Sequence, residues 1–188
     1  MDFEKDILNC ITVLKSGGII LYPTDTVWGL GCDATNEKAV EKIFALKKRP
    51  DEKSMIILVA DKKEVMQYIA TPDLHVFDYL DKATKPTTVI YDNAISLANN
   101  LIAKDGSVAI RICKDEFCRH LIKRFRKPIV STSANISGEV APKIFSEIKS
   151  VIKEGADYIV QHRQGDDHIA DPSTIIKWKN GSLNIIRP

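Results

Sequence analysis

Short apolar, β-branched runs alternate with helical patterns along this chain, and this alternation restricts its fold more than any other feature. Runs of strand length stand at residues 18–22, 54–60, 87–91, 107–112, 128–130 and 158–160. Two further runs, 173–177 and 183–186, surround an Asn-Gly pair and predict a closing hairpin. Strands that alternate with helices favour parallel pairing, whereas a hairpin is antiparallel. The pattern therefore predicts one α/β (α+β) domain over residues 1–188, with a mixed sheet.

Apolar positions at helical spacing predict the helices that flank this sheet. The first helix reaches Leu14, with Asp2 or Asp6 as its cap, and stops at a pair of glycines. Asn36 is the expected cap of the second helix, and Pro50 marks its end. Further helices are expected at residues 62–69, 73–80, 94–102, 115–125 and 145–153.

Composition and charge limit the class of protein. A chain of 188 residues that is 44% hydrophobic supports one sizeable core. A net charge of +2 does not by itself indicate nucleic-acid binding, and it fits an anionic ligand held by a few local cations. The four cysteines and four histidines form no zinc pattern, so we expect free, buried thiols. The acidic start has no apolar signal core, and no apolar run approaches the ~20 residues of a membrane span, so a cytoplasmic location is expected.

The segment PTDTVWGLG at residues 23–31 directly follows a predicted buried strand. Ligands of open α/β sheets gather at strand ends, so the hydroxyls of Thr24 and Thr26 beside Asp25 can hold a small molecule with an amine and a hydroxyl. A turn in which these side chains bond to their own backbone is an equally good interpretation.

Cationic side chains stand in three separate places. The segment KKRP at residues 47–50, with Lys53 nearby, closes a predicted helix. Cations there either offset the helix dipole or clamp a phosphate. The residues alone favour the interaction with the helix dipole. Arg111 lies inside an apolar strand, so it is either exposed or bound to a carboxylate. Arg187 follows the last strand, where a solvated side chain is the default interpretation.

The segment STSANISG at residues 131–138 follows a short apolar strand. Its hydroxyl and backbone N–H groups form either an anion-binding nest or a polar turn. Ser133 is not in a GxSxG motif, and the chain has no Walker motif and no GxGxxG, so ATP would need a less common site.

Taken together and in this order, the segments at 23–31, 47–50, 108–111 and 131–138 resemble the YrdC family of threonylcarbamoyl-AMP synthases. The resemblance runs from about residue 11 to residue 187 and includes the family's Lys-x-Arg and Ser-x-Asn signature. It implies a twisted mixed sheet flanked by helices around a large, basic, concave site. The signature residues are Lys47, Arg49, Ser133 and Asn135.

The family resemblance implies a nucleotidyltransferase that makes L-threonylcarbamoyladenylate from L-threonine, bicarbonate and ATP and releases pyrophosphate. Partner proteins would transfer the threonylcarbamoyl group to the adenosine next to the anticodon in tRNA. Mg²⁺ is expected with the triphosphate, with no protein-held metal.

The resemblance also implies roles for individual residues, in a site where side chains from separate segments converge on one hollow. The expected catalytic residues are Lys47 and Arg49. Those expected to bind threonine are Thr24, Thr26, Arg111, Ser131 and Ser173. Those expected to bind ATP are Lys47, Arg49, Lys53, Ser107, Ser133, Asn135 and Arg187.

The chain departs from the family pattern in several places. Trp28 replaces a usual Tyr, Leu58 stands where many longer members carry a His, and residues 84–88 replace a Pro-Gly-Pro-x-Thr segment. We expect no additional C-terminal domain. Two alternatives stay open: a module that binds double-stranded RNA or tRNA, and a paralogue of the same fold with a different substrate.

Overall fold

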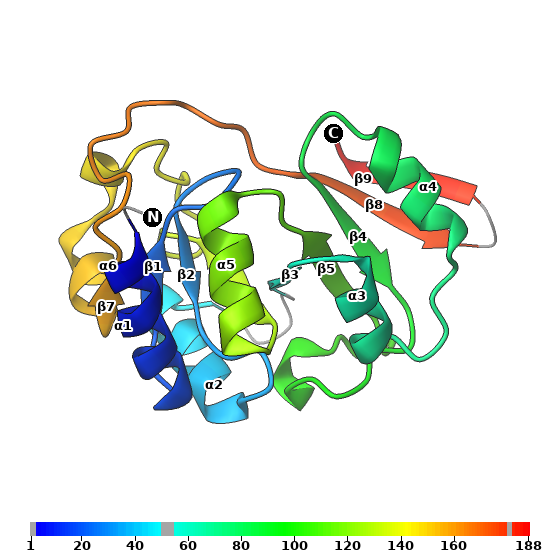
Figure 1. Ribbon diagram of the computed structural model, residues 1–188, viewed down its shortest axis with the longest axis horizontal. Coiled ribbons are helices and arrows are strands. Elements are labelled where there is room, and N and C mark those ends of the chain that lie inside the picture. Colours follow the sequence, from blue (N-terminus) through cyan, green and yellow to red (C-terminus); the bar gives the residue numbers. More distant parts are fainter. Residues whose placement is uncertain (1–2, 50–54, 180–181) are drawn as a thin grey trace.

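The computed structural model describes residues 3–49, 55–179 and 182–188, and there the chain forms one mixed sheet with helices packed against it (Figure 1). The strands are β1 (Ile20–Tyr22), β2 (Gly29–Gly31), β3 (Ile56–Val59), β4 (Thr87–Tyr91), β5 (Val108–Ile112), β6 (Ile129–Ser133), β7 (Tyr158–Ile159), β8 (Thr174–Lys179) and β9 (Ser182–Arg187). The α-helices are α1 (Glu4–Lys15), α2 (Glu37–Lys47), α3 (Lys62–Tyr68), α4 (His75–Lys82), α5 (Glu116–Phe125) and α6 (Ser150–Glu154).

The sheet combines parallel and antiparallel pairs, which confirms the predicted mixed α/β fold. Its strand order is β7-β1-β2-β6-β3-β5-β4-β8-β9. The pairs β1–β7, β3–β5 and β4–β8 are parallel, and the other neighbours are antiparallel. The β3 run lies at the centre of the sheet, and the last two strands form the predicted hairpin.

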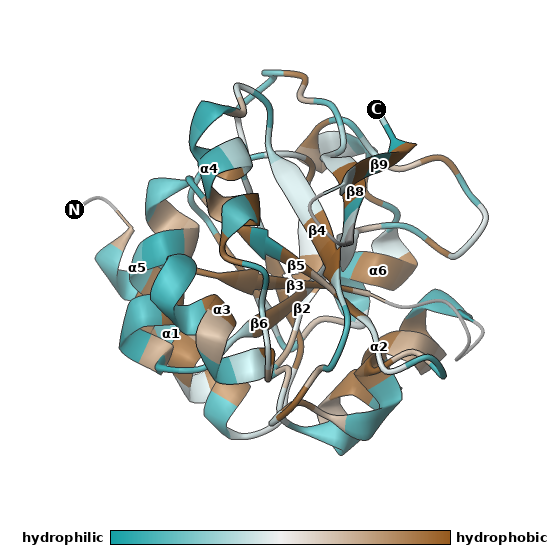
Figure 2. Cartoon of the chain, turned by 90° about the vertical axis from the view of Figure 1, so that its right-hand side faces the viewer, coloured by the Kyte–Doolittle hydropathy of each residue, from teal (hydrophilic) through white to brown (hydrophobic). Residues whose placement is uncertain are grey.

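Apolar side chains fill both faces of the sheet. Helices α1 and α5 pack on one face, against Tyr22, Leu58 and Ile129. Helix α2 packs on the other face, in a larger core that includes Leu21 and Ile57. Figure 2 shows the result, with hydrophobic strands inside and hydrophilic outer helix surfaces. The four cysteines are buried and free, as predicted. No helix in the described part of the chain is long and apolar enough to cross a membrane.

Side-chain caps explain where several helices begin. The carboxamide of Asn36 accepts the N–H of Ala39 at 3.2 Å, which confirms the predicted cap of α2. The cap predicted for α1 is wrong for Asp6, and Asp2 lies outside the described residues. Asp6 lies inside the helix, where its carboxylate accepts the N–H groups of Gln161 and His162. It therefore ties α1 to the chain after β7.

Two other predictions are corrected. Residues 94–102 form no α-helix, only a 3-10 turn at Asn99–Leu101, because Asn93 and Ser96 have left-handed backbone with φ of 60° and 56°. Residues 145–153 form a 3-10 turn at Phe145–Glu147 followed by α6. The structure also adds β2, a strand that the sequence does not predict, and extends β6 through Ser133.

Strand β2 requires glycine at Gly31, and a matched pair of variants tests this. A Cβ at Gly31 would lie 2.6 Å from the Tyr22 ring and 2.8 Å from the Val130 carbonyl oxygen. A Cβ at Gly29 would meet Ser131 Oγ only at 3.3 Å. We expect Gly31→Ala to lower the free energy of unfolding by about 1–3 kcal/mol and Gly29→Ala to lower it much less. Urea denaturation measures both, and equal losses would contradict this packing argument.

A candidate substrate cavity

Strand register brings polar side chains from distant segments to one face of the sheet. Arg111 stands opposite Leu58 and Thr88, and Ser131 stands opposite Ile56. Because paired residues share a face and residues two apart on a strand share it too, these side chains all project to the side that α1 and α5 cover in part. A cavity of about 260 Å³ lies there, and it is lined by Thr26, Val27, Gly29, Arg49, Met55, Ile56, Arg111, Ser131, Thr132, Ser133, Ala141, Pro172, Ser173, Ile175 and Arg187.

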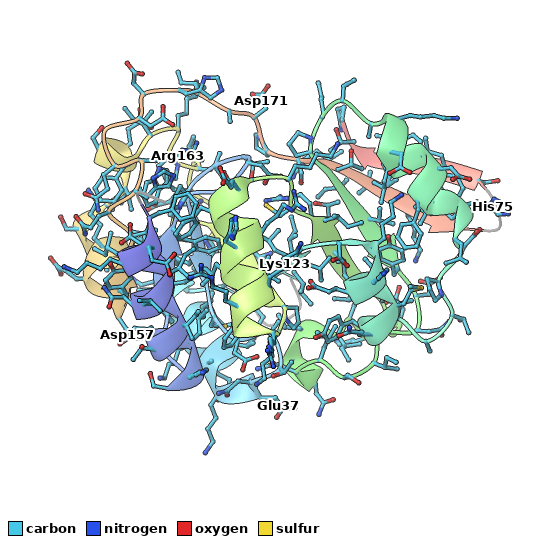
Figure 3. All side chains as sticks on the ribbon, viewed as in Figure 1. Glu37, His75, Lys123, Asp157, Arg163 and Asp171 are labelled. Atoms are coloured by element: carbon cyan, nitrogen blue, oxygen red, sulfur yellow. The ribbon has the colours of Figure 1, made fainter. Side chains whose placement is uncertain are left out.

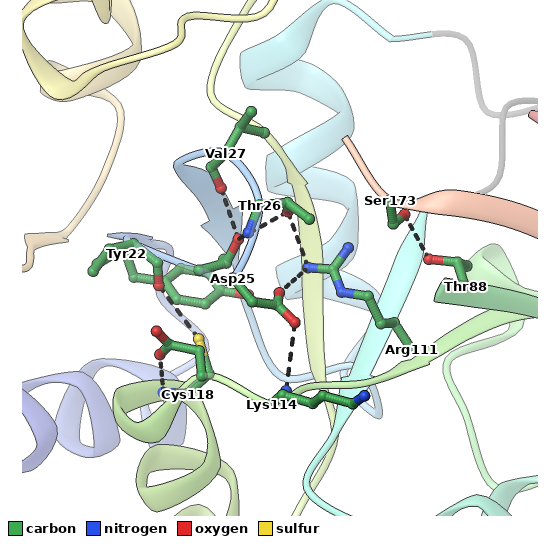
Figure 4. A network of polar contacts seen from close by, with 12 residues as sticks. Tyr22, Asp25, Thr26, Val27, Thr88, Arg111, Lys114, Cys118 and Ser173 are labelled. Carbon is green, nitrogen blue, oxygen red and sulfur yellow. Dashed lines mark hydrogen bonds and ion pairs between the residues drawn. The ribbon is translucent and has the colours of Figure 1, made fainter. Parts of the chain in front are cut away.

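Arg111 is buried at the cavity, with 3% of its side chain exposed. One terminal nitrogen lies 3.0 Å from a carboxylate oxygen of Asp25 and donates to the Thr26 hydroxyl at 3.2 Å (Figure 4). The other Asp25 oxygen accepts the N–H of Lys114 at 3.4 Å. Burial of a guanidinium is costly unless it is paired, so Asp25 is what allows a cation inside an apolar strand.

The turn at residues 24–27 is organised by a chain of hydroxyl contacts. The Thr24 hydroxyl donates to the Val27 carbonyl oxygen at 2.8 Å and accepts the N–H of Thr26 at 3.0 Å. Since its one proton is used, the 3.0 Å contact between the two hydroxyls has Thr26 as the donor to Thr24. The Thr26 oxygen then accepts from Arg111. Thr24 thus forms the self-bonded turn, and Thr26 lines the cavity.

Lys47 lies beneath the loop at residues 133–139 rather than in the cavity lining. Its side chain is buried, and Nζ donates to the carbonyl oxygens of Ser133 and Asn135, the latter at 2.6 Å. The N–H of Ser137 returns a bond to the Lys47 carbonyl oxygen at 2.8 Å. Burial lowers the pKa of Lys47 to about 8, with a smaller contribution from the charge of Arg49.

The side chain of Asn135 holds the same loop. Its Oδ1 accepts from the Ser133 hydroxyl at 2.5 Å, and its Nδ2 donates to the carbonyl oxygen of Glu139 at 2.7 Å. Ser133 itself lines the cavity. Lys47 and Asn135 therefore set the position of the loop that carries Ser133.

Three arginines from separate segments line this one cavity: Arg49 after α2, Arg111 in β5 and Arg187 at the end of β9. Burial lowers the pKa of Arg49, and burial together with the charge of Arg111 lowers the pKa of Arg187. Arg187 donates twice to the Ser173 carbonyl oxygen, at 3.1 and 2.7 Å. Among the described residues no carboxylate side chain lines the cavity, so it is strongly attractive to anions.

The cavity brings together many of the residues that the sequence singled out. Those in its lining are Thr26, Arg49, Arg111, Ser131, Ser133, Ser173 and Arg187. Those directly behind it are Thr24, Lys47 and Asn135. Ser107 lies apart, before β5, where its hydroxyl donates to Asp105 at 2.6 Å. Lys53 lies outside the described residues.

Sequence reasoning passed over Asp25 as a site residue, although a signal for it existed. An arginine within an apolar strand needs a carboxylate partner, and Asp25 stands in the segment with the densest polar side chains. It also passed over Thr88, whose hydroxyl contacts the Ser173 hydroxyl at 2.8 Å. A threonine in a strand carries no comparable signal.

Comparisons with known proteins place the chain in a family. The family model for Sua5, YciO and YrdC proteins, described as telomere recombination, matches residues 12–188. A protein of Pseudoalteromonas translucida named threonylcarbamoyl-AMP synthase is 32% identical over 186 residues, which cover 97% of this chain and 98% of that one.

Solved structures share the fold. A double variant of P. abyssi Sua5 superposes with a TM-score of 0.89 at 25% identity, over 98% of this chain. The chain spans 56% of the length of that protein. P. abyssi Sua5 in complex with L-threonine gives a TM-score of 0.86 at 24% identity, over 98% of this chain and 54% of that one. By its matched family model and by the identity of its relatives, this chain belongs to the Sua5/YciO/YrdC family.

Proposed function

We propose that this protein is a nucleotidyltransferase that makes L-threonylcarbamoyladenylate from L-threonine, bicarbonate and ATP. The observation that carries the proposal is the convergence of Arg49, Arg111 and Arg187 on one cavity that is also lined by hydroxyl groups. The relative named threonylcarbamoyl-AMP synthase supports it, because the match extends over nearly the whole of both chains.

The chemistry requires charge neutralisation and held geometry more than a covalent nucleophile. The amine of threonine takes up the carboxyl group of bicarbonate, with loss of water, to give a carbamate. A carbamate oxygen then forms a bond to the α-phosphorus of ATP while the bond to pyrophosphate breaks. An anion thus attacks a polyanion, so preorganised cations and N–H or O–H donors supply the main stabilisation.

The Arg111 end of the cavity suits the amino acid. A guanidinium binds a carboxylate through two parallel hydrogen bonds, and here Asp25 and Thr26 together hold one terminal nitrogen of Arg111. The Thr26 hydroxyl beside it, and those of Ser131 and Ser173, would recognise the polar groups of threonine.

Arg49, Arg187 and the hydroxyl of Ser133 suit the triphosphate. Lys47 and Asn135 act in this proposal as positioning residues, because they hold the Ser133 loop from below. The described part of the chain has no group of three or more His, Cys, Asp or Glu side chains that could hold a metal ion. In this proposal Mg²⁺ enters with the nucleotide substrate, bound mostly by phosphate oxygens and water.

The wider role follows from the same assignment. The product is a mixed anhydride and would pass to transfer proteins that modify the adenosine next to the anticodon in tRNA. We place this work in the cytoplasm.

The first test is pyrophosphate release by the purified protein. We expect release when ATP, bicarbonate and L-threonine are all present and none when threonine is omitted. A screen across the other amino acids, in parallel, distinguishes a paralogue with a different substrate. Release that is indifferent to threonine would overturn the proposal. So would an inert protein that binds double-stranded RNA with a steep salt dependence.

A pair of arginine variants tests the division of the cavity. Arg111→Ala should raise the KM for threonine by roughly tenfold to a hundredfold, as expected for loss of a charge-assisted contact worth about 1.5–3 kcal/mol. Arg49→Ala should act mainly on the KM for ATP. Steady-state kinetics with each substrate varied in turn separates the two effects. Equal effects of both variants on both substrates would contradict separate subsites.

The buried Lys47 predicts a pH dependence of stability. Its pKa is about 8 in the folded protein and 10.5 in an ordinary environment, so between these values the unfolded chain binds more protons. Rising pH therefore favours the folded state over this window. We expect the stability of the wild type relative to Lys47→Met to increase from about pH 8 to pH 10.5. Urea denaturation across this range measures it, and a constant difference would contradict a lowered pKa.

A further inference from the structure

A long loop connects β7 with the cavity lining at Pro172 and Ser173. Residues 160–173 leave β7 and cross the top of the molecule to β8 (Figure 1), and Figure 3 labels Arg163 and Asp171 along its course. At its far end Pro172 and Ser173 line the cavity. At its near end the loop is held by Arg163, a residue that neither the sequence analysis nor the proposed chemistry uses.

Arg163 joins three parts of the chain with one guanidinium. One terminal nitrogen donates to the Thr24 carbonyl oxygen and to a carboxylate oxygen of Asp115, each at 3.2 Å. Its Nε donates to Asp166, in the same loop, at 3.0 Å. The other oxygen of Asp115 caps α5 by accepting the N–H of Cys118 at 2.9 Å. The guanidinium thus links the loop, the start of α5 and the turn that follows β1 by hydrogen bonds and ion pairs.

The contact with Thr24 reaches the cavity through hydroxyl groups. The Thr24 side chain accepts from the N–H and the hydroxyl of Thr26, and Thr26 Oγ1 in turn accepts from Arg111. A shift of the Thr24 peptide therefore moves the hydroxyl that lines the cavity and loosens the group that holds Arg111. Arg163 acts on the amino-acid end of the cavity without lining it.

The backbone of Arg163 has an uncommon conformation for a residue with a side chain. Its φ is 66°, in the left-handed region that non-glycine residues rarely adopt. Such a conformation persists where surrounding contacts over-determine it. Glycine would relax this backbone, yet the chain places there the side chain that makes these three bonds.

We propose that Arg163 is a positioning residue for the amino-acid subsite, which it sets by holding the carbonyl of Thr24. The inference rests on the proposed function, because it takes threonine as the ligand of that subsite. It predicts a selective effect on threonine, because Arg163 bonds to the turn that carries Thr26, at the amino-acid end of the cavity.

The experiment compares Arg163→Ala, Arg163→Lys and Arg163→Gly with the wild type. We expect Arg163→Ala to raise both the Kd for L-threonine by calorimetry and the KM for threonine about tenfold, with the KM for ATP changed less than twofold. Lysine should restore the affinity only in part, because it lacks the second nitrogen with which the guanidinium bonds Asp166 while the first bonds Thr24 and Asp115. Added methylguanidine should recover part of the threonine affinity of Arg163→Gly.

The control is Arg126→Ala, which removes an exposed arginine that also has left-handed backbone, at the end of α5 and away from the cavity. It should leave both KM values unchanged. If Arg163→Gly binds threonine as the wild type does, the arginine only fastens the loop and the inference is wrong. If the KM values for ATP and threonine rise together without rescue, general loss of structure explains the result and the inference is also wrong.

The wild type separates this inference from the proposed function. A wild-type protein that ignores threonine overturns the proposed function itself. A wild type that depends on threonine, with an unaffected Arg163→Ala variant, overturns only the role of Arg163.

Discussion

The ion pair between Arg111 and Asp25 is the interaction on which the rest of the cavity depends. A guanidinium that is 3% exposed in a central strand would be costly without a partner, and removing one member of a buried pair typically costs about 3–5 kcal/mol. The carboxylate must therefore approach β5, and the turn after β1 brings it there. The same turn carries Thr26. The approach of Asp25 to Arg111 therefore also places the Thr26 hydroxyl in the cavity lining.

The sheet positions the other groups through its period of two. In β6 Ser131 and Ser133 point to the same side as Ile129, with Val130 and Thr132 between them, and in β5 Arg111 alternates with Ile110 and Ile112. Half of each strand thus packs in a core while the other half faces the cavity or the helices α1 and α5. Close approach of β2 to its neighbours requires a residue without a side chain at Gly31. The strand geometry that packs the core therefore also places the polar side chains in the cavity lining.

Several polar residues around the cavity do not line it but hold the segments that do. Lys47 and Asn135 hold the loop that carries Ser133, and Arg163 holds the turn that carries Thr26. Each donates to backbone carbonyl oxygens of a partly buried segment. These bonds hold irregular backbone beside charged side chains in one conformation, as the proposed stabilisation of a reacting polyanion requires.

The sequence by itself determined the elements with strong local signals. The strand at residues 87–91, the cap at Asn36 and the closing hairpin follow from periodicity, capping chemistry and turn residues. The ordered segments also indicated the family and the convergence of Arg49, Arg111 and Ser133 on one cavity. Local patterns misled where tertiary contacts prevailed: residues 94–102 look helical, yet Ala94 pairs with Ile69 and Ile95 donates to the Tyr68 carbonyl oxygen.

Only the tertiary structure decided which charged groups line the cavity and which support it. Lys47 and Arg49 are two residues apart and both carry a cationic side chain. The side chain of Lys47 is buried under a loop, whereas that of Arg49 lines the cavity. The partners of Arg111 and Arg163 come from segments far away along the chain. Local propensity carries no information about such pairs, because they depend on the register of the whole sheet and on the cost of burying an unpaired charge.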